Sequence, residues 1–225
     1  MYLTKLLFID SGKQPFAVTS LKDISKEQSS IAKMLFLTAF SRFFVMGITI
    51  VGLPFIVRTV LGLNAQYYGA AESSLAVAVI IGSVAAGLLA EKMKIHRLAV
   101  LLASMGVFLI PAGIVFLCPA DSIIKYAVTL VSFCGMQIVI SMFSIFAVSL
   151  IQQSTPNHLI GKVMAYTSTV TLCVQPIGQI VYGFLFDRFR NMIYLCLIPT
   201  GVIVCAVGMS AMGFFRKFEK EQQSS

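Results

Sequence analysis

The stretch GSVAAGLLAEKM at residues 82–93 aligns without gaps with GQIVYGFLFDRF at residues 178–189. Both stretches begin with G-x4-G, continue with three apolar residues, and then place an acid, a base and a further apolar residue. The offset between the two copies is 96 residues, and each copy closes a long apolar segment. The chain therefore contains an internal repeat that relates two long hydrophobic segments.

The composition excludes an ordinary soluble domain. The 225 residues are 58% hydrophobic and 12% charged, whereas soluble domains carry about 25% charged residues. Crossing the hydrocarbon core takes about 20 helical residues, and the apolar runs lack the alternation that a membrane β-barrel requires. Backbone groups in lipid must also pair within their own segment. We therefore expect six transmembrane helices at residues 34–58, 71–90, 97–118, 124–151, 163–186 and 191–214.

The two repeat copies close the second and the fifth of these six spans. Three spans separate the copies, so they should leave the membrane on opposite sides. The predicted fold is an all-α membrane protein whose six helices form two inverted three-helix repeats. Such a repeat within six spans is typical of secondary transporters.

The distribution of positive charge predicts the orientation. The net charge is +8, but twelve basic residues fall on one side of the six spans and four on the other. Since cytoplasmic loops carry the excess of Lys and Arg, both termini should be cytoplasmic, in the plasma membrane, and no nucleic-acid partner is implied. The expected organisation is a cytoplasmic lead segment at 1–33, a bundle at 34–215 and a cytoplasmic tail at 216–225.

Polar residues within the spans are the candidates for a substrate pathway. They recur on single helical faces, and Arg42 is the only charge that lies more than one residue inside a predicted span. An intramembrane charge favours a functional role, although a long side chain can also reach the lipid surface. The amide and hydroxyl groups could equally serve as interhelical hydrogen bonds. The candidates are Arg42, Thr49, Gln137, Ser141, Gln175 and Gln179. Spans 3 and 6 are almost wholly apolar and are expected to face lipid.

The glycine, acid and base of each repeat copy form a second candidate set, for gating. An acid and a base at a helix end could bridge to neighbouring helices in one conformational state and separate in another. The alternative is an ordinary helix end with solvated charges, since exposed ion pairs contribute only about 0–1 kcal/mol. The residues of this set are Gly87, Glu91, Lys92, Gly183, Asp187 and Arg188.

No pattern in the sequence predicts an enzyme, a metal site or a cofactor. Zinc-protease, nucleophile-elbow and phosphate-loop motifs are missing, and the two histidines lie more than sixty residues apart. The five cysteines lie in or beside apolar spans and are expected to be small buried hydrophobes.

Three motifs resemble the major facilitator superfamily. The segment from Gly87 to Lys92 resembles its G-x-x-x-D-[RK]-x-G-[RK]-[RK] loop, with Lys94 in place of the later glycine. Residues 156–163 resemble its P-x4-G-[RK]-V pattern, and residues 175–187 its eleventh helix. The resemblance covers about residues 34–215 and is closest to the C-terminal half of bacterial drug or macrolide efflux permeases.

The resemblance implies half of a secondary active transporter that exports small amphiphilic molecules by alternating access, with residues 1–33 as the linker between halves. Such a half should lie in the lipid bilayer and pair with an N-terminal six-helix half or a second copy, or be an inactive truncated product. The alternative is a non-transporting membrane assembly or regulatory subunit.

Overall fold

The computed structural model describes residues 29–89, 96–153, 155, 157, 159–190 and 192–223. Within these ranges the chain is helical and contains no strand. Six helical segments are long and apolar enough to span a membrane, which confirms the predicted fold class. The elements are α2 (Ser29–Gly47), η1 (Ile48–Gly52), η2 (Phe55–Val60), α3 (Ala65–Leu89), α4 (His96–Ile114), α5 (Ser122–Gln153), α6 (Ile160–Arg188) and α7 (Tyr194–Gln223).

The first span is irregular in its second half. It continues from α2 into the two π-helical segments η1 and η2, which flank Pro54. Proline lacks the backbone N–H of a helical hydrogen bond, and π-helical turns are one way in which a helix accommodates a local disruption. Met34–Val60 nevertheless remains one membrane-spanning segment.

The helices pack in pairs that follow the sequence repeat. Three of the four most extensive pairs are α2 with α6, α3 with α5, and α4 with α7. Exchanging the two repeats converts the first pair into the second and leaves the third unchanged. The symmetry is incomplete, because α4 also packs along α5 whereas α7 contacts α2 only slightly.

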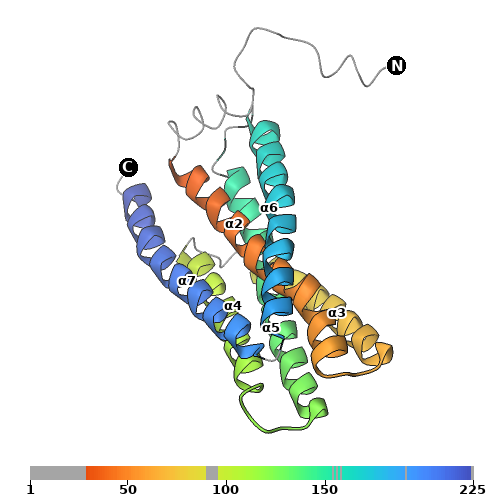
Figure 1. Cartoon of the computed structure of the whole chain (residues 1–225). Coiled ribbons are helices and arrows are strands. Elements are labelled where there is room, and N and C mark those ends of the chain that lie inside the picture. Colours follow the sequence, from red (N-terminus) through yellow and green to blue (C-terminus); the bar gives the residue numbers. More distant parts are fainter. Residues whose placement is uncertain are drawn as a thin grey trace, which may run out of the picture.

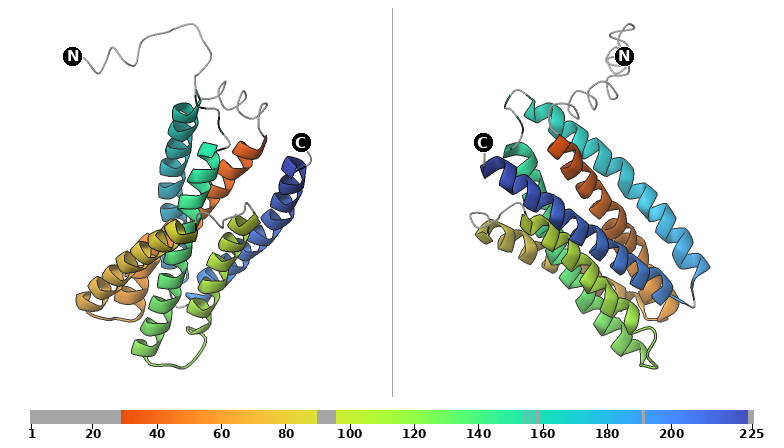
Figure 2. Two further views of the ribbon diagram at one scale, coloured as in Figure 1. Left: turned by 180° about the vertical axis from the view of Figure 1, so that it is seen from behind. Right: turned by 90° about the vertical axis from the view of Figure 1, so that its left-hand side faces the viewer.

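The helix directions agree with an inverted repeat. The C-terminal ends of α3 and α6, which carry the two repeat copies, lie at opposite ends of the bundle (Figure 2). The start of α2 and the end of α7 lie at the same end, as an even number of spans requires (Figure 1).

Two glycines related by the repeat lie where the paired helices cross. A Cβ atom at Gly82 of α3 would lie 2.5 Å from the carbonyl oxygen of Ile138 on α5. A Cβ atom at Gly178 of α6 would clash with the carbonyl oxygen of Phe43 on α2. These contacts explain the first glycine of each G-x4-G copy, because only a residue without a side chain lets the backbones approach so closely.

The second glycine of each copy has no such contact. A Cβ at Gly87 would meet no atom within 4 Å, and one at Gly183 would lie 3.8 Å from a methyl group of Val51. In the described part of the chain, neither of these two glycines is required by a close helix contact.

The helices differ in how much of each is buried against the rest of the chain. In an 18-residue window of each span, 44% of the residues are buried in α4 and 39% in α7, against 22% in α3 and 17% in α6. These values measure contact within the chain alone, so the expectation that spans 3 and 6 face lipid stays a prediction. Here α4 and α7 cover one another.

Candidate functional site

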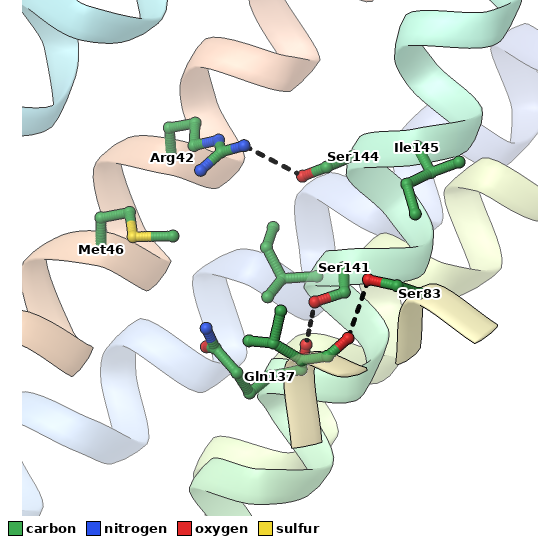
Figure 3. A pocket seen from close by; sticks show the side chains of 9 residues that line it. Arg42, Met46, Ser83, Gln137, Ser141, Ser144 and Ile145 are labelled. Carbon is green, nitrogen blue, oxygen red and sulfur yellow. Dashed lines mark hydrogen bonds between the residues drawn. The ribbon is translucent and has the colours of Figure 1, made fainter. Parts of the chain in front are cut away.

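A pocket of about 230 Å³ lies between α2, α3 and α5. These three helices belong to both repeats, and the residues that line the pocket include one cation, several neutral polar side chains and several apolar ones (Figure 3). The residues that line it are Arg42, Met46, Val79, Ser83, Gln137, Ile140, Ser141, Ser144 and Ile145.

The side chain of Arg42 crosses from α2 toward α5 (Figure 3). Its guanidinium donates a hydrogen bond to the hydroxyl of Ser144, with an N–O distance of 3.4 Å. Arg42 lies eight residues after Met34, where the first span begins, and Ser144 nine residues before the end of α5 at Gln153. At 1.5 Å per residue both groups lie roughly 12–14 Å inside the same end of the bundle. The contact thus joins two helices at one depth.

Gln137 and Ser141 lie one helical turn apart on α5 and both line the pocket. The Ser141 hydroxyl donates to the backbone carbonyl of Gln137 at 2.9 Å. The side-chain oxygen Oε1 of Gln137 is buried and has no hydrogen-bond partner among the described residues. Ser83 of α3 likewise donates to its own helix, to the carbonyl of Val79 at 2.9 Å. The pocket therefore holds hydrogen-bonding capacity that the protein itself does not use.

The structure brings together three of the six predicted pathway residues, namely Arg42, Gln137 and Ser141. Thr49 is buried in η1 outside the pocket, and its hydroxyl oxygen has no partner among the described residues. Gln175 and Gln179 lie half-buried on α6, a helix that packs on α2 but contributes nothing to the pocket.

The sequence candidates omitted two polar pocket residues. Ser144 lies three residues after Ser141 and seven after Gln137, so helical spacing alone places it on the same face. Ser83 lies on the second span, which contributed no candidate to the pathway set. Its neighbour Gly82 makes the helix crossing, and this close approach of α3 to α5 brings Ser83 to the pocket.

Of the polar pocket residues of α5, Ser144 joins another helix through Arg42, whereas Gln137 and Ser141 do not act as interhelical connections. In the described chain, the side chains of Gln137 and Ser141 make no hydrogen bond to another helix. Connections of that kind are made elsewhere, for example between Tyr182 of α6 and Thr200 of α7 at 2.9 Å.

The predicted gating residues lie at the helix ends. Asp187 and Arg188 are exposed in the last turn of α6. Gly87 is exposed near the end of α3 and Gly183 is half-buried on α6. Glu91 and Lys92 lie outside the described residues, so a gating role for this acid–base pair stays a prediction.

Within the described residues, no group of three or more His, Cys, Asp or Glu side chains is arranged to hold a metal ion. All five cysteines are free, and only Cys196 is fully buried. The expectation that the cysteines act as buried small hydrophobes therefore does not hold for Cys118 and Cys173, which are exposed on the surface of an apolar bundle.

Comparison with protein families gives one match. The family model described as Major Facilitator Superfamily matches residues 4–174, from the segment before α2 into α6. Neither the curated proteins nor the solved structures contain a match. Because the matched region is more than half of the chain, and six helices are able to span a membrane, this multi-pass membrane protein belongs to the Major Facilitator Superfamily of transporters.

Proposed function

We propose that the chain forms one half of a secondary active transporter and that the pocket between α2, α3 and α5 is its part of the solute path. The observation that carries this proposal is the convergence of Arg42, Gln137 and Ser141 at one pocket inside the bundle. Polar and ionisable groups are costly within a membrane and commonly line pathways for substrates. The expected solutes are small amphiphilic molecules, exported by alternating access.

The rival function is a non-transporting assembly or regulatory subunit, whose polar side chains would only join helices. That function predicts partnered side chains. The unpartnered oxygen of Gln137 and the intrahelical hydrogen bond of Ser141 favour a path for solute instead.

The transport unit requires an opposing six-helix wall, either an N-terminal half on another chain or a second copy. Ligand pockets usually enclose about 300–1,000 Å³. The 230 Å³ pocket is smaller than that, as expected if it is the part of a larger cavity that this chain contributes. We place the partner against α3 and α6, the two least buried spans.

Those two helices expose matching apolar stripes. Residues at the 96-residue offset are exposed in both repeats, with relative exposures from 51% to 78%. The pairs are Ile81 with Ile177, Val84 with Ile180, and Leu88 with Phe184. The stripes alternate with the buried Gly82 and Gly178, so each helix has one face for its neighbour and one that is free for the opposing unit.

The acid–base ends of the repeats would then serve as gates on opposite membrane faces. Asp187 and Arg188 end α6 with exposed side chains, which leaves them free to meet the opposing unit. Cytoplasmic termini, a plasma-membrane location, and the division into a lead segment 1–33, a bundle 34–215 and a tail 216–225 are part of the same proposal.

A transport assay tests the proposal. Cells that express the chain, with and without its native membrane partners, are loaded with a panel of cationic, neutral and anionic fluorescent amphiphiles, and intracellular retention is measured. We expect retention of at least one dye to fall, and Gln137→Leu to abolish the fall at equal membrane abundance. The control Gln152→Leu changes an exposed glutamine on the same helix and should retain transport. Equal retention of every dye in cells with Gln137→Leu and in cells with the unmodified chain would contradict the proposal.

Crosslinking identifies the partner. In a chain whose five native cysteines are replaced by alanine, the single-cysteine variants Val84→Cys and Ile180→Cys are crosslinked in native membranes, with Val107→Cys on α4 as the exposed control. A product of twice the chain mass would indicate a second copy, and a heavier or lighter product an N-terminal half. Crosslinks from α4 but none from α3 or α6 would exclude the proposed face.

A further inference from the structure

The pocket carries a positive charge that no described side chain neutralises. Among the described residues that line it, Arg42 is the only charged one and none is acidic. Within the described chain, the guanidinium makes one hydrogen bond, to the neutral hydroxyl of Ser144. A guanidinium offers five N–H donors, so most of its capacity remains available to a ligand.

The acids whose side chains are described lie too far along the bundle to compensate. Glu72 is near the start of α3, Asp121 directly precedes α5, and Asp187 is in the last turn of α6. These three positions are at the end of the bundle opposite to the start of α2, whereas Arg42 is eight residues from the start of the first span. Among the described side chains, Arg42 therefore has no acidic partner.

We propose that the pocket selects organic anions, and that Arg42 recognises the carboxylate or phosphate group of the solute. This inference rests on the proposed function, and it names the substrate class of the same pocket. Guanidinium groups match planar carboxylates and phosphates with two parallel hydrogen bonds. Gln137 and Ser141 would contact neutral polar atoms, and Met46 and Ile140 the apolar part of the solute.

Binding can be measured directly because the chain contains no tryptophan. The variant Ile145→Trp places a single indole at the pocket wall, at a residue that is 41% exposed and thus has room for a larger side chain. The purified chain in neutral detergent is titrated with benzoate, benzyl alcohol and benzylammonium, which share a ring and differ in charge.

We expect benzoate to bind at least about tenfold more tightly than benzyl alcohol, and benzylammonium to give no saturable signal. Arg42→Gln should remove the preference and Arg42→Lys should retain it in part, which separates charge from packing. The control Arg58→Gln alters an exposed arginine in the same span, outside the pocket, and should change nothing.

An anionic lipid headgroup offers the same chemistry as a small solute, so the titration is repeated with phosphatidylglycerol in the micelles. Unchanged benzoate binding supports the small anion, whereas a lipid that alone quenches the indole and blocks benzoate would overturn it. Equal affinity for all three probes would also overturn the inference. If the three probes bind equally but more weakly to Gln137→Leu, the proposed solute path survives and only the preference for anions is wrong. If no probe binds and the transport assay is negative, the anion preference and the solute path are both wrong.

Discussion

Replacing Gln137 with leucine separates a solute-binding residue from a structural one. The side-chain oxygen of Gln137 is buried without a partner in the described chain. An unsatisfied buried polar group costs about 1–3 kcal/mol, and leucine has a similar volume. The replacement should therefore raise the free energy of unfolding by about 1 kcal/mol, which for a chain of this size raises Tm by about 2–4 °C.

The assay combines thermal unfolding of the purified chain in detergent with the dye-retention measurement in cells. We expect Gln137→Leu to melt at a higher temperature and to lose transport. Gln152→Leu, at the exposed end of α5, should change the melting free energy by less than about 0.5 kcal/mol and keep transport.

The opposite result would refute this reasoning. If Gln137 joined helices through a hydrogen bond, its removal would lower stability by about 0.6–2 kcal/mol. A lower Tm for Gln137→Leu, together with unchanged transport, would assign the residue to helix association and support the non-transporting subunit.

Two further predictions concern the helix crossings, and both are measured by thermal unfolding in detergent. Gly82→Ala and Gly178→Ala should each destabilise the bundle by about 1–3 kcal/mol, because the added Cβ would collide with a backbone carbonyl. The control Gly87→Ala places its Cβ in open space and should be neutral or stabilising. Equal effects at all three positions would contradict the crossing geometry. Tyr182→Phe should cost about 0.6–2 kcal/mol through the lost hydrogen bond to Thr200, and no change in Tm would show that this contact does not hold α6 to α7.

The spans were predictable because the bilayer sets both their length and their composition. The largest difference at the start of a helix is in the second span, which was expected from residue 71 but begins in a helix at Ala65. Its first turns contain Gln66, Tyr67, Tyr68 and Glu72, which are polar enough to end an apolar run and still helical. Hydropathy therefore located the membrane segment and missed the helix that extends beyond it.

The pocket was predictable only in part. Arg42, Gln137 and Ser141 were among the pathway candidates because they are polar positions within spans, and the pocket contains all three. Gln175 and Gln179 have the same polarity and a similar helical spacing, but α6 packs on another side of α2. Spacing defines a face of one helix; which helix that face meets depends on crossings such as the one at Gly82, which residue types alone do not fix.

The central claim, that the pocket is a water-accessible wall of a solute path, is tested most directly by alkylation of Ser144→Cys with a membrane-impermeant maleimide. Val202→Cys on α7 is the control, because it is 53% exposed on the outside of the bundle and away from the pocket. With the signal of the unmodified chain subtracted, we predict that Ser144→Cys is labelled in sealed vesicles that expose the cytoplasmic side and that Val202→Cys is not. If Ser144→Cys stays as unreactive as Val202→Cys from both sides of the membrane, the pocket is dry and the account is wrong.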